Sequence, residues 1–120
     1  MYFEIDNYNA LKEALHRMCA GFFAEDVPDG VVFDSRLVAH ELLINALRYG
    51  GGRAYFTVER TGDEIRISVR SANAYRPPEE VSRADVTEER GRGLYLVDSI
   101  ATARAYSEAE GISVVLLIEK

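Results

Sequence analysis

The sequence is poor in the residues that mark disulfide-rich, zinc-binding and membrane-spanning proteins. Cys19 is the only cysteine among 120 residues, so the chain can form neither an internal disulfide nor a cysteine zinc cluster. A reducing compartment, the cytoplasm, is therefore expected. No run of about 18 apolar residues is present that could cross a membrane. Residues 1–15 contain acidic side chains and no long apolar stretch, so they are not expected to be a signal peptide.

Positive charge is also scarce. The chain has 14 lysines and arginines against 20 aspartates and glutamates, which gives a formal net charge of −6. Duplex DNA and anionic membranes are bound through basic surfaces, so we expect neither a nucleic acid nor a membrane as a direct partner. The balance does not exclude a small phosphate-bearing ligand, which needs only a few local positive groups.

Apolar periodicity predicts one α+β domain over residues 1–120, with helices and an antiparallel-leaning sheet in two layers. The predicted order is strand, helix, helix, hairpin, polar loop, helix and hairpin. The expected elements are a strand at 2–5, a helix of about 17 residues capped by Asp6 or Asn7, a central helix capped by Asp34 or Ser35 and ended by Gly50–Gly52, strands at 54–59 and 65–70, a helix at 93–101, and strands at 104–107 and 112–118.

The central helix contains LVAHELLINALRYGGG at residues 37–52 and has two stripes. An apolar stripe with a spacing of three and four residues is formed by Val38, Leu42, Ala46 and Tyr49. Glu41, Asn45 and Arg48 recur at the same spacing on an adjacent stripe. Asparagine is a mediocre helix former, which favours a role for Asn45 other than helix formation. The alternative is that the three polar residues form the solvated edge of an amphipathic helix.

A second segment, EERGRGLYLVDSIA at residues 88–101, places two glycines at the expected start of a helix. Such a start exposes backbone N–H groups at the positive end of the helix dipole, which suits a phosphate. The polar segment before it has no sustained apolar periodicity. In a compact domain, segments of this kind are usually lids, binding loops or disordered. We therefore predict a lid loop at about residues 71–92.

Two short motifs stand in these segments: Glu41-x-x-x-Asn45-Ala46 with Tyr49-Gly50, and Gly91-x-Gly93-Leu94. Together they resemble the motifs of the GHKL ATP-binding family. That family includes the gyrase B subunit, heat-shock chaperones, mismatch-repair ATPases, sensor histidine kinases and the small anti-sigma-factor serine kinases. The short chain looks most like the last group. The resemblance implies a mixed, mostly antiparallel sheet with helices on one face, and ATP and Mg²⁺ as ligands between the helix layer and the lid.

The resemblance also implies roles for the central helix. The side-chain oxygen of Asn45 would complete the ligand shell of a Mg²⁺ ion that also holds the phosphates, since Mg²⁺ prefers oxygen ligands. Glu41 resembles the general base of the family, which orients a water or an acceptor serine hydroxyl. Arg48 would either face the phosphates or pair with Glu41. The alternative for both Asn45 and Glu41 is a solvated side chain on the helix surface.

The glycine motif is expected to hold the phosphates. The backbone of Gly91 and Gly93 and the amide of Leu94 would approach them closely, because glycine lacks a side chain that hinders the approach. Arg92, or Arg90 beside it, would add positive charge near the terminal phosphate. The alternative is that both arginines are exposed residues of the lid.

One position departs from the family pattern. The family has an aspartate just after the second hairpin strand, usually followed by glycines, and its carboxylate accepts a hydrogen bond from the adenine amino group. Ser71 occupies that position here, and Asn73 and Ala74 stand where glycine is expected. Loss of a charged acceptor would weaken ATP binding about ten- to hundred-fold. Asn73 is a candidate to compensate.

These observations imply two functions. The first is an ATP-binding regulator similar to an anti-sigma-factor serine/threonine protein kinase, which phosphorylates an antagonist protein, binds a sigma factor or similar regulator, and commonly forms a homodimer. The second is a GHKL scaffold impaired in nucleotide binding that acts as a protein-binding regulator. An unrelated α+β domain with coincidental motifs is a third, weaker alternative. The sequence leaves open whether the protein is an enzyme.

Overall fold

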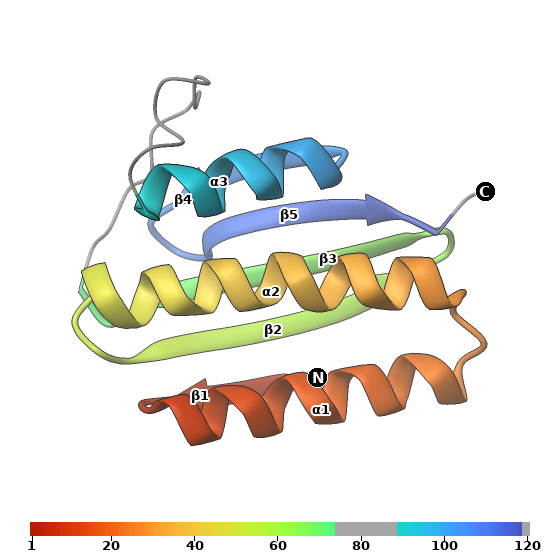
Figure 1. Ribbon diagram of the computed structural model, residues 1–120, viewed down its shortest axis with the longest axis horizontal. Helices are drawn as coiled ribbons and strands as arrows, with labels where there is room; N and C mark the ends of the chain where they lie inside the picture. The colour runs from red at the N-terminus through yellow and green to blue at the C-terminus, as the bar shows by residue number, and fades with distance from the viewer. Residues whose placement is uncertain (74–88, 119–120) are drawn as a thin grey trace.

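The computed structural model describes residues 1–73 and 89–118, and in these residues it shows a five-stranded sheet covered by three helices (Figure 1). In chain order the elements are β1 (Tyr2–Ile5), α1 (Tyr8–Ala24), α2 (Asp29–Tyr49), β2 (Ala54–Thr61), β3 (Glu64–Ser71), α3 (Glu89–Ile100), β4 (Ala103–Ser107) and β5 (Gly111–Leu117). The predicted order of elements and the two-layer α+β fold are confirmed. None of the described helices is both long and apolar enough to cross a bilayer.

The strand order in the sheet is β1-β2-β3-β5-β4, and the four pairings between these described strands are all antiparallel, although a mixed sheet was expected. The reason is the direction of β4, which runs the same way as β3 without being its neighbour. The turn after β4 reverses the chain, so β5 enters between β3 and β4 antiparallel to both. Val69 of β3 is thereby paired with Ile112 of β5.

The three helices lie on one face of the sheet, with α2 in the middle (Figure 1). It packs against α1 on one side, α3 on the other and the central strands beneath. Every third or fourth residue of α2 is buried, which is the pattern expected for a helix with one face on the core. The buried residues of α2 are Val32, Ser35, Val38, Ala39, Leu42, Leu43, Asn45 and Ala46.

Two helix starts illustrate what a sequence can predict. At the start of α1, Asn7 is the N-cap as predicted, because its Oδ1 atom accepts a hydrogen bond of 2.8 Å from the Ala10 amide. The prediction that Asp34 or Ser35 caps α2 is wrong, because that helix begins at Asp29 after Pro28. Ser35 is fully buried, so its side chain belongs to the core face of a longer helix.

The hydroxyl group of Ser35 is enclosed and has no hydrogen-bond partner among the described residues. A buried hydroxyl of this kind costs about 1–3 kcal/mol, and alanine is also the better helix former. Ser35→Ala is therefore expected to raise the free energy of unfolding by about 1–2 kcal/mol in urea denaturation. Ser99→Ala is the control, because that hydroxyl is on an exposed part of α3 and donates to the Tyr95 carbonyl at 2.9 Å. A loss of stability in Ser35→Ala would contradict the expectation.

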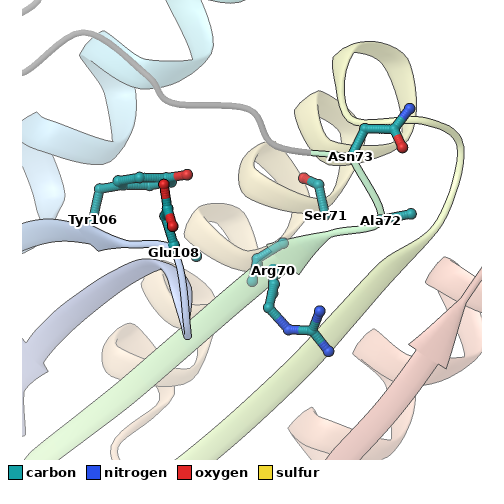
Figure 2. Close-up of a pocket in the computed structure, with 8 residues that line it drawn as sticks. Arg70, Ser71, Ala72, Asn73, Tyr106 and Glu108 are labelled. Carbon is teal, nitrogen blue, oxygen red and sulfur yellow. The ribbon is translucent and has the colours of Figure 1, made fainter.

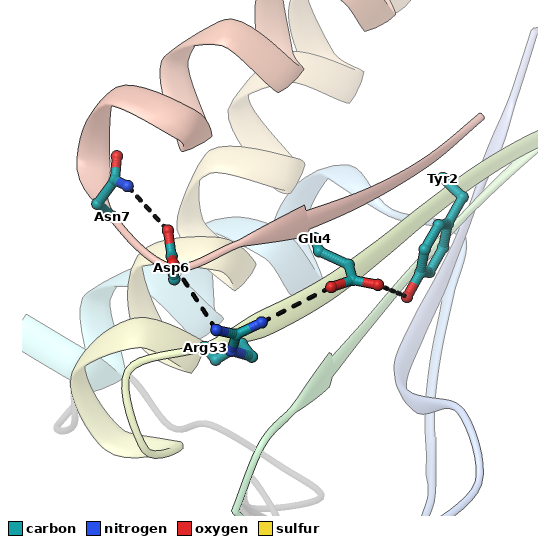
Figure 3. Close-up of polar contacts among 5 residues, drawn as sticks. All are labelled: Tyr2, Glu4, Asp6, Asn7 and Arg53. Carbon is teal, nitrogen blue, oxygen red and sulfur yellow. Dashed lines mark hydrogen bonds and ion pairs between the residues drawn. The ribbon is translucent and has the colours of Figure 1, made fainter.

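A cluster of polar side chains holds the edge strand β1 to the loop that follows α2 (Figure 3). The Arg53 guanidinium lies 3.6 Å from a carboxylate oxygen of Glu4 and 3.7 Å from one of Asp6. All three side chains are about half exposed, so each ion pair contributes at most about 1 kcal/mol. The cluster fixes where the chain leaves α2 and enters β2, close to the site described next.

Candidate functional site

Three segments that are far apart in the sequence meet at one end of the molecule. They are the C-terminal end of α2, the end of β3 and the N-terminal end of α3 (Figure 1). The backbone joins the first two directly, because the Asn73 amide donates to the Gly50 carbonyl at 2.8 Å and the Ala72 amide donates to the Arg53 carbonyl at 2.9 Å. The two sequence motifs, which lie on α2 and α3, are thus brought to the same end by the packing of these helices.

Asn45 lies on the buried face of α2 with 4% of its surface exposed. Its Nδ2 atom is enclosed and has no hydrogen-bond partner among the residues that the structure describes. An unpaired amide in a core costs about 1–3 kcal/mol, so this residue is unfavourable for stability alone. Rotation by half a turn about the Cβ–Cγ bond exchanges the amide nitrogen and oxygen. The side-chain amide of Asn45 therefore offers an oxygen, which is the type of ligand that a hard cation prefers.

Glu41 lies one helical turn before Asn45, with 25% of its side chain exposed. Its Oε2 atom is 3.4 Å from Nδ1 of His40, which sequence analysis had given no role. Adjacent residues of a helix do not normally face each other, so sequence spacing gives no signal for this contact. Arg48 lies two turns after Glu41 on the exposed part of the helix. Glu41 is thus a half-buried carboxylate beside a histidine, and the spacing of four residues places it on the same side of α2 as Asn45.

The end of α2 is in direct contact with Ser71. Gly50 is buried, and a Cβ atom placed on it would lie 2.3 Å from both Cβ and Oγ of Ser71. Only a glycine permits this approach of the helix end to β3, which gives a physical reason for the glycine in the first motif. Asn73 is exposed and packs its side-chain amide against Gly51, whose φ of +94° also favours glycine.

The prediction that α3 begins at Gly93 is wrong by four residues, because the helix begins at Glu89. Gly91 and Gly93 therefore lie inside its first turns, where a helix tolerates glycine at a cost of about 1 kcal/mol each. The backbone amides left free at a helix start are those of the first turn, whereas the amides of Gly93 and Leu94 lie further along. The Leu94 side chain is fully buried in the core. The Arg92 side chain and residues 74–88 of the predicted lid lie outside the described residues.

A pocket with a volume of about 290 Å³ opens where β3 ends, beside the turn between β4 and β5 (Figure 2). Its described lining residues are mostly polar: Val69, Arg70, Ser71, Ala72, Asn73, Tyr106, Glu108 and Gly111. Ser71 and Asn73 are predicted site residues, whereas the sequence predicts no role for Tyr106 or Glu108. Ser71 lines this pocket and also contacts Gly50, so the pocket lies beside the end of α2.

The two sequence motifs and the polar pocket thus lie at one end of a two-layer α+β domain. A family model described as a histidine kinase-like ATPase domain matches residues 6–118. The chain belongs to this family, and membership implies ATP binding, typically with Mg²⁺. Among curated proteins no significant match is found.

Proposed function

We propose that this protein is a Mg²⁺-ATP-dependent regulator of the anti-sigma-factor kinase type. It would phosphorylate a serine or threonine of an antagonist protein and bind a sigma factor or a similar regulator. The observation that supports this best is the buried amide of Asn45, whose Nδ2 atom has no partner among the described residues, one helical turn from the half-buried Glu41 carboxylate. Such an amide does not stabilise the fold, whereas in an ATP site its oxygen can serve as a ligand for Mg²⁺.

The residues at this end of the molecule would have separate roles in binding and phosphoryl transfer. When bound, ATP supplies the phosphoryl group, and Mg²⁺ neutralises part of the negative charge of the phosphates. Asn45 would hold the metal through its amide oxygen, and Glu41 would accept the proton of the acceptor hydroxyl. His40, 3.4 Å from Glu41, would keep that carboxylate oriented. The free amides at the start of α3 would bind phosphate oxygens.

The glycines of α3 affect which backbone amides can reach a phosphate. A phosphate contact by the amides of Gly93 or Leu94 requires the first turn of α3 to open, because amides inside a helix are already hydrogen-bonded. Each glycine weakens the helix by about 1 kcal/mol relative to alanine, so opening is easier here than in an ordinary helix. The sequence GRG thus combines a helix start with a segment that can rearrange around a ligand.

The proposed metal site is tested by calorimetric titration of Mg²⁺-ATP into the wild type and Asn45→Ala. We expect the variant to bind at least about tenfold more weakly and to lose the dependence of affinity on Mg²⁺, since one oxygen ligand is removed. Its melting temperature should not fall, because the substitution also removes a buried Nδ2 atom that lacks a partner in the part of the chain that the structure describes. Asn9→Ala, on an exposed position of α1, is the matched control. Equal affinity in Asn45→Ala and the wild type would rule out the proposed ligand.

A second function is favoured by one observation, the serine at the end of β3. Ser71 supplies no carboxylate to a nucleotide base, and it is fixed against Gly50. A scaffold impaired in nucleotide binding would keep its protein partners and show no heat of binding with Mg²⁺-ATP. The titration of the wild type therefore separates the two functions.

A further inference from the structure

The pocket at the end of β3 contains a carboxylate that sequence analysis did not assign. Tyr106 from β4 and Glu108 from the following turn line one wall, and Ser71 lies on the opposite side (Figure 2). The three residues come from two segments 35 positions apart, which the pairing of β3 with β5 brings together. The volume of about 290 Å³ is at the lower end of the range for small-molecule pockets, which suits one aromatic base.

Arg70, the other charged residue among the described lining, does not compete for this carboxylate. Its guanidinium is turned away from Tyr106 and Glu108 in Figure 2. It lies over the ring of Tyr55, with Cζ 4.3 Å from the ring centroid, on the face of the sheet that the helices do not cover. The charge that the described wall offers to a ligand is therefore negative, and it comes from Glu108.

We propose that Glu108 accepts a hydrogen bond from the exocyclic amino group of the nucleotide base and so replaces the carboxylate that is missing at Ser71. The inference rests on the proposed nucleotide site. A carboxylate only accepts hydrogen bonds, so it favours an amino-bearing edge such as that of adenine and disfavours a carbonyl edge such as that of hypoxanthine. The ring of Tyr106 provides an apolar surface beside it, and the Ser71 hydroxyl can donate or accept on the opposite side.

The test compares ATP with inosine triphosphate, which carries a carbonyl oxygen in place of the amino group. Both are titrated with Mg²⁺ into the wild type, Glu108→Gln and Glu110→Gln. Glutamine can donate as well as accept, so Glu108→Gln should bind ATP about tenfold more weakly and bind inosine triphosphate no more weakly than the wild type does. Glu110→Gln makes the same change of charge in the same turn, but its carboxylate lies 3.5 Å from Ser113 Oγ, outside the pocket.

The expected result is a wild-type preference for ATP that falls about tenfold in Glu108→Gln and stays unchanged in Glu110→Gln. An unchanged preference in Glu108→Gln would overturn the assignment, and an equal loss in both variants would do the same by showing a general effect of charge. In either case ATP still binds the wild type, so the proposed function would stand. If the wild type binds neither nucleotide, the proposed function fails, and the assignment of Glu108 fails with it.

Discussion

Glu41→Gln is expected to lower the rate of phosphoryl transfer to the protein substrate by about 10²–10⁴-fold, the usual contribution of a general base. The substitution keeps the shape of the side chain and removes its ability to accept a proton at neutral pH. ATP affinity should change by less than about twofold, because the proposed metal ligand is Asn45 and not Glu41. The measurement is transfer of labelled phosphate from ATP to candidate antagonist proteins encoded beside the gene, together with a binding titration.

The matched control is Glu13→Gln on α1. That carboxylate is 63% exposed and pairs with Arg17 four residues later, so its loss should leave the transfer rate unchanged. A Glu41→Gln variant that transfers phosphate as fast as the wild type would exclude this carboxylate as the base. A variant that also loses ATP binding would instead show that Glu41 supports the nucleotide site as a whole.

Gly111→Ala is expected to cause the largest loss of stability, about 2–5 kcal/mol in the free energy of unfolding. Gly111 has a φ of +75°, and a Cβ atom on it would lie 2.2 Å from the Val69 carbonyl oxygen and 2.5 Å from the Arg70 Cα atom. Both contacts are with the backbone of β3, which cannot move without disturbing the sheet and the pocket. Urea denaturation measures the loss, and nucleotide titration should show weaker binding in whatever fraction remains folded.

Gly62→Ala separates the two causes of that loss. Gly62 also has a positive φ, +60°, but nothing lies within 4 Å of the position of its Cβ atom. Only the backbone strain applies there, at about 1–2 kcal/mol. If both variants lose the same stability, the close approach of β5 to β3 does not limit substitution at Gly111.

The sequence predicted those parts of the fold that depend on local chemistry. The β2–β3 hairpin follows from strict alternation and a turn at Gly62, and the start of α1 follows from Asn7, whose side chain caps its own helix. The start of α2 could not be predicted in this way. Asp34 and Ser35 have the composition of a cap, yet packing against the sheet extends the helix back to Asp29, and core burial outweighs the local preference of Ser35.

The candidate site shows the same division. Glu41 and Asn45 are predicted as site residues because an acid and an amide one turn apart stand out on an apolar helix, and their roles stay predictions. Glu108 was not predicted as a pocket residue because nothing in its own turn distinguishes it from Glu110, which lies two residues away. Only the pairing of β3 with β5 and the enclosed space beside Ser71 separate the two carboxylates. Such differences arise from the packing of segments that are far apart in the sequence, so the local sequence does not show them.

The adjacency of β3 and β5 has a consequence for how this domain can vary. These two central strands are neighbours in space, yet the chain between them includes α3, β4 and every residue from 72 to 110. In general, each doubling of the length of a flexible loop between fixed ends costs only about 0.6 kcal/mol. Engineered forms should therefore tolerate loop insertions between β3 and α3, because the register of β3 with β5 does not depend on the length of that connection.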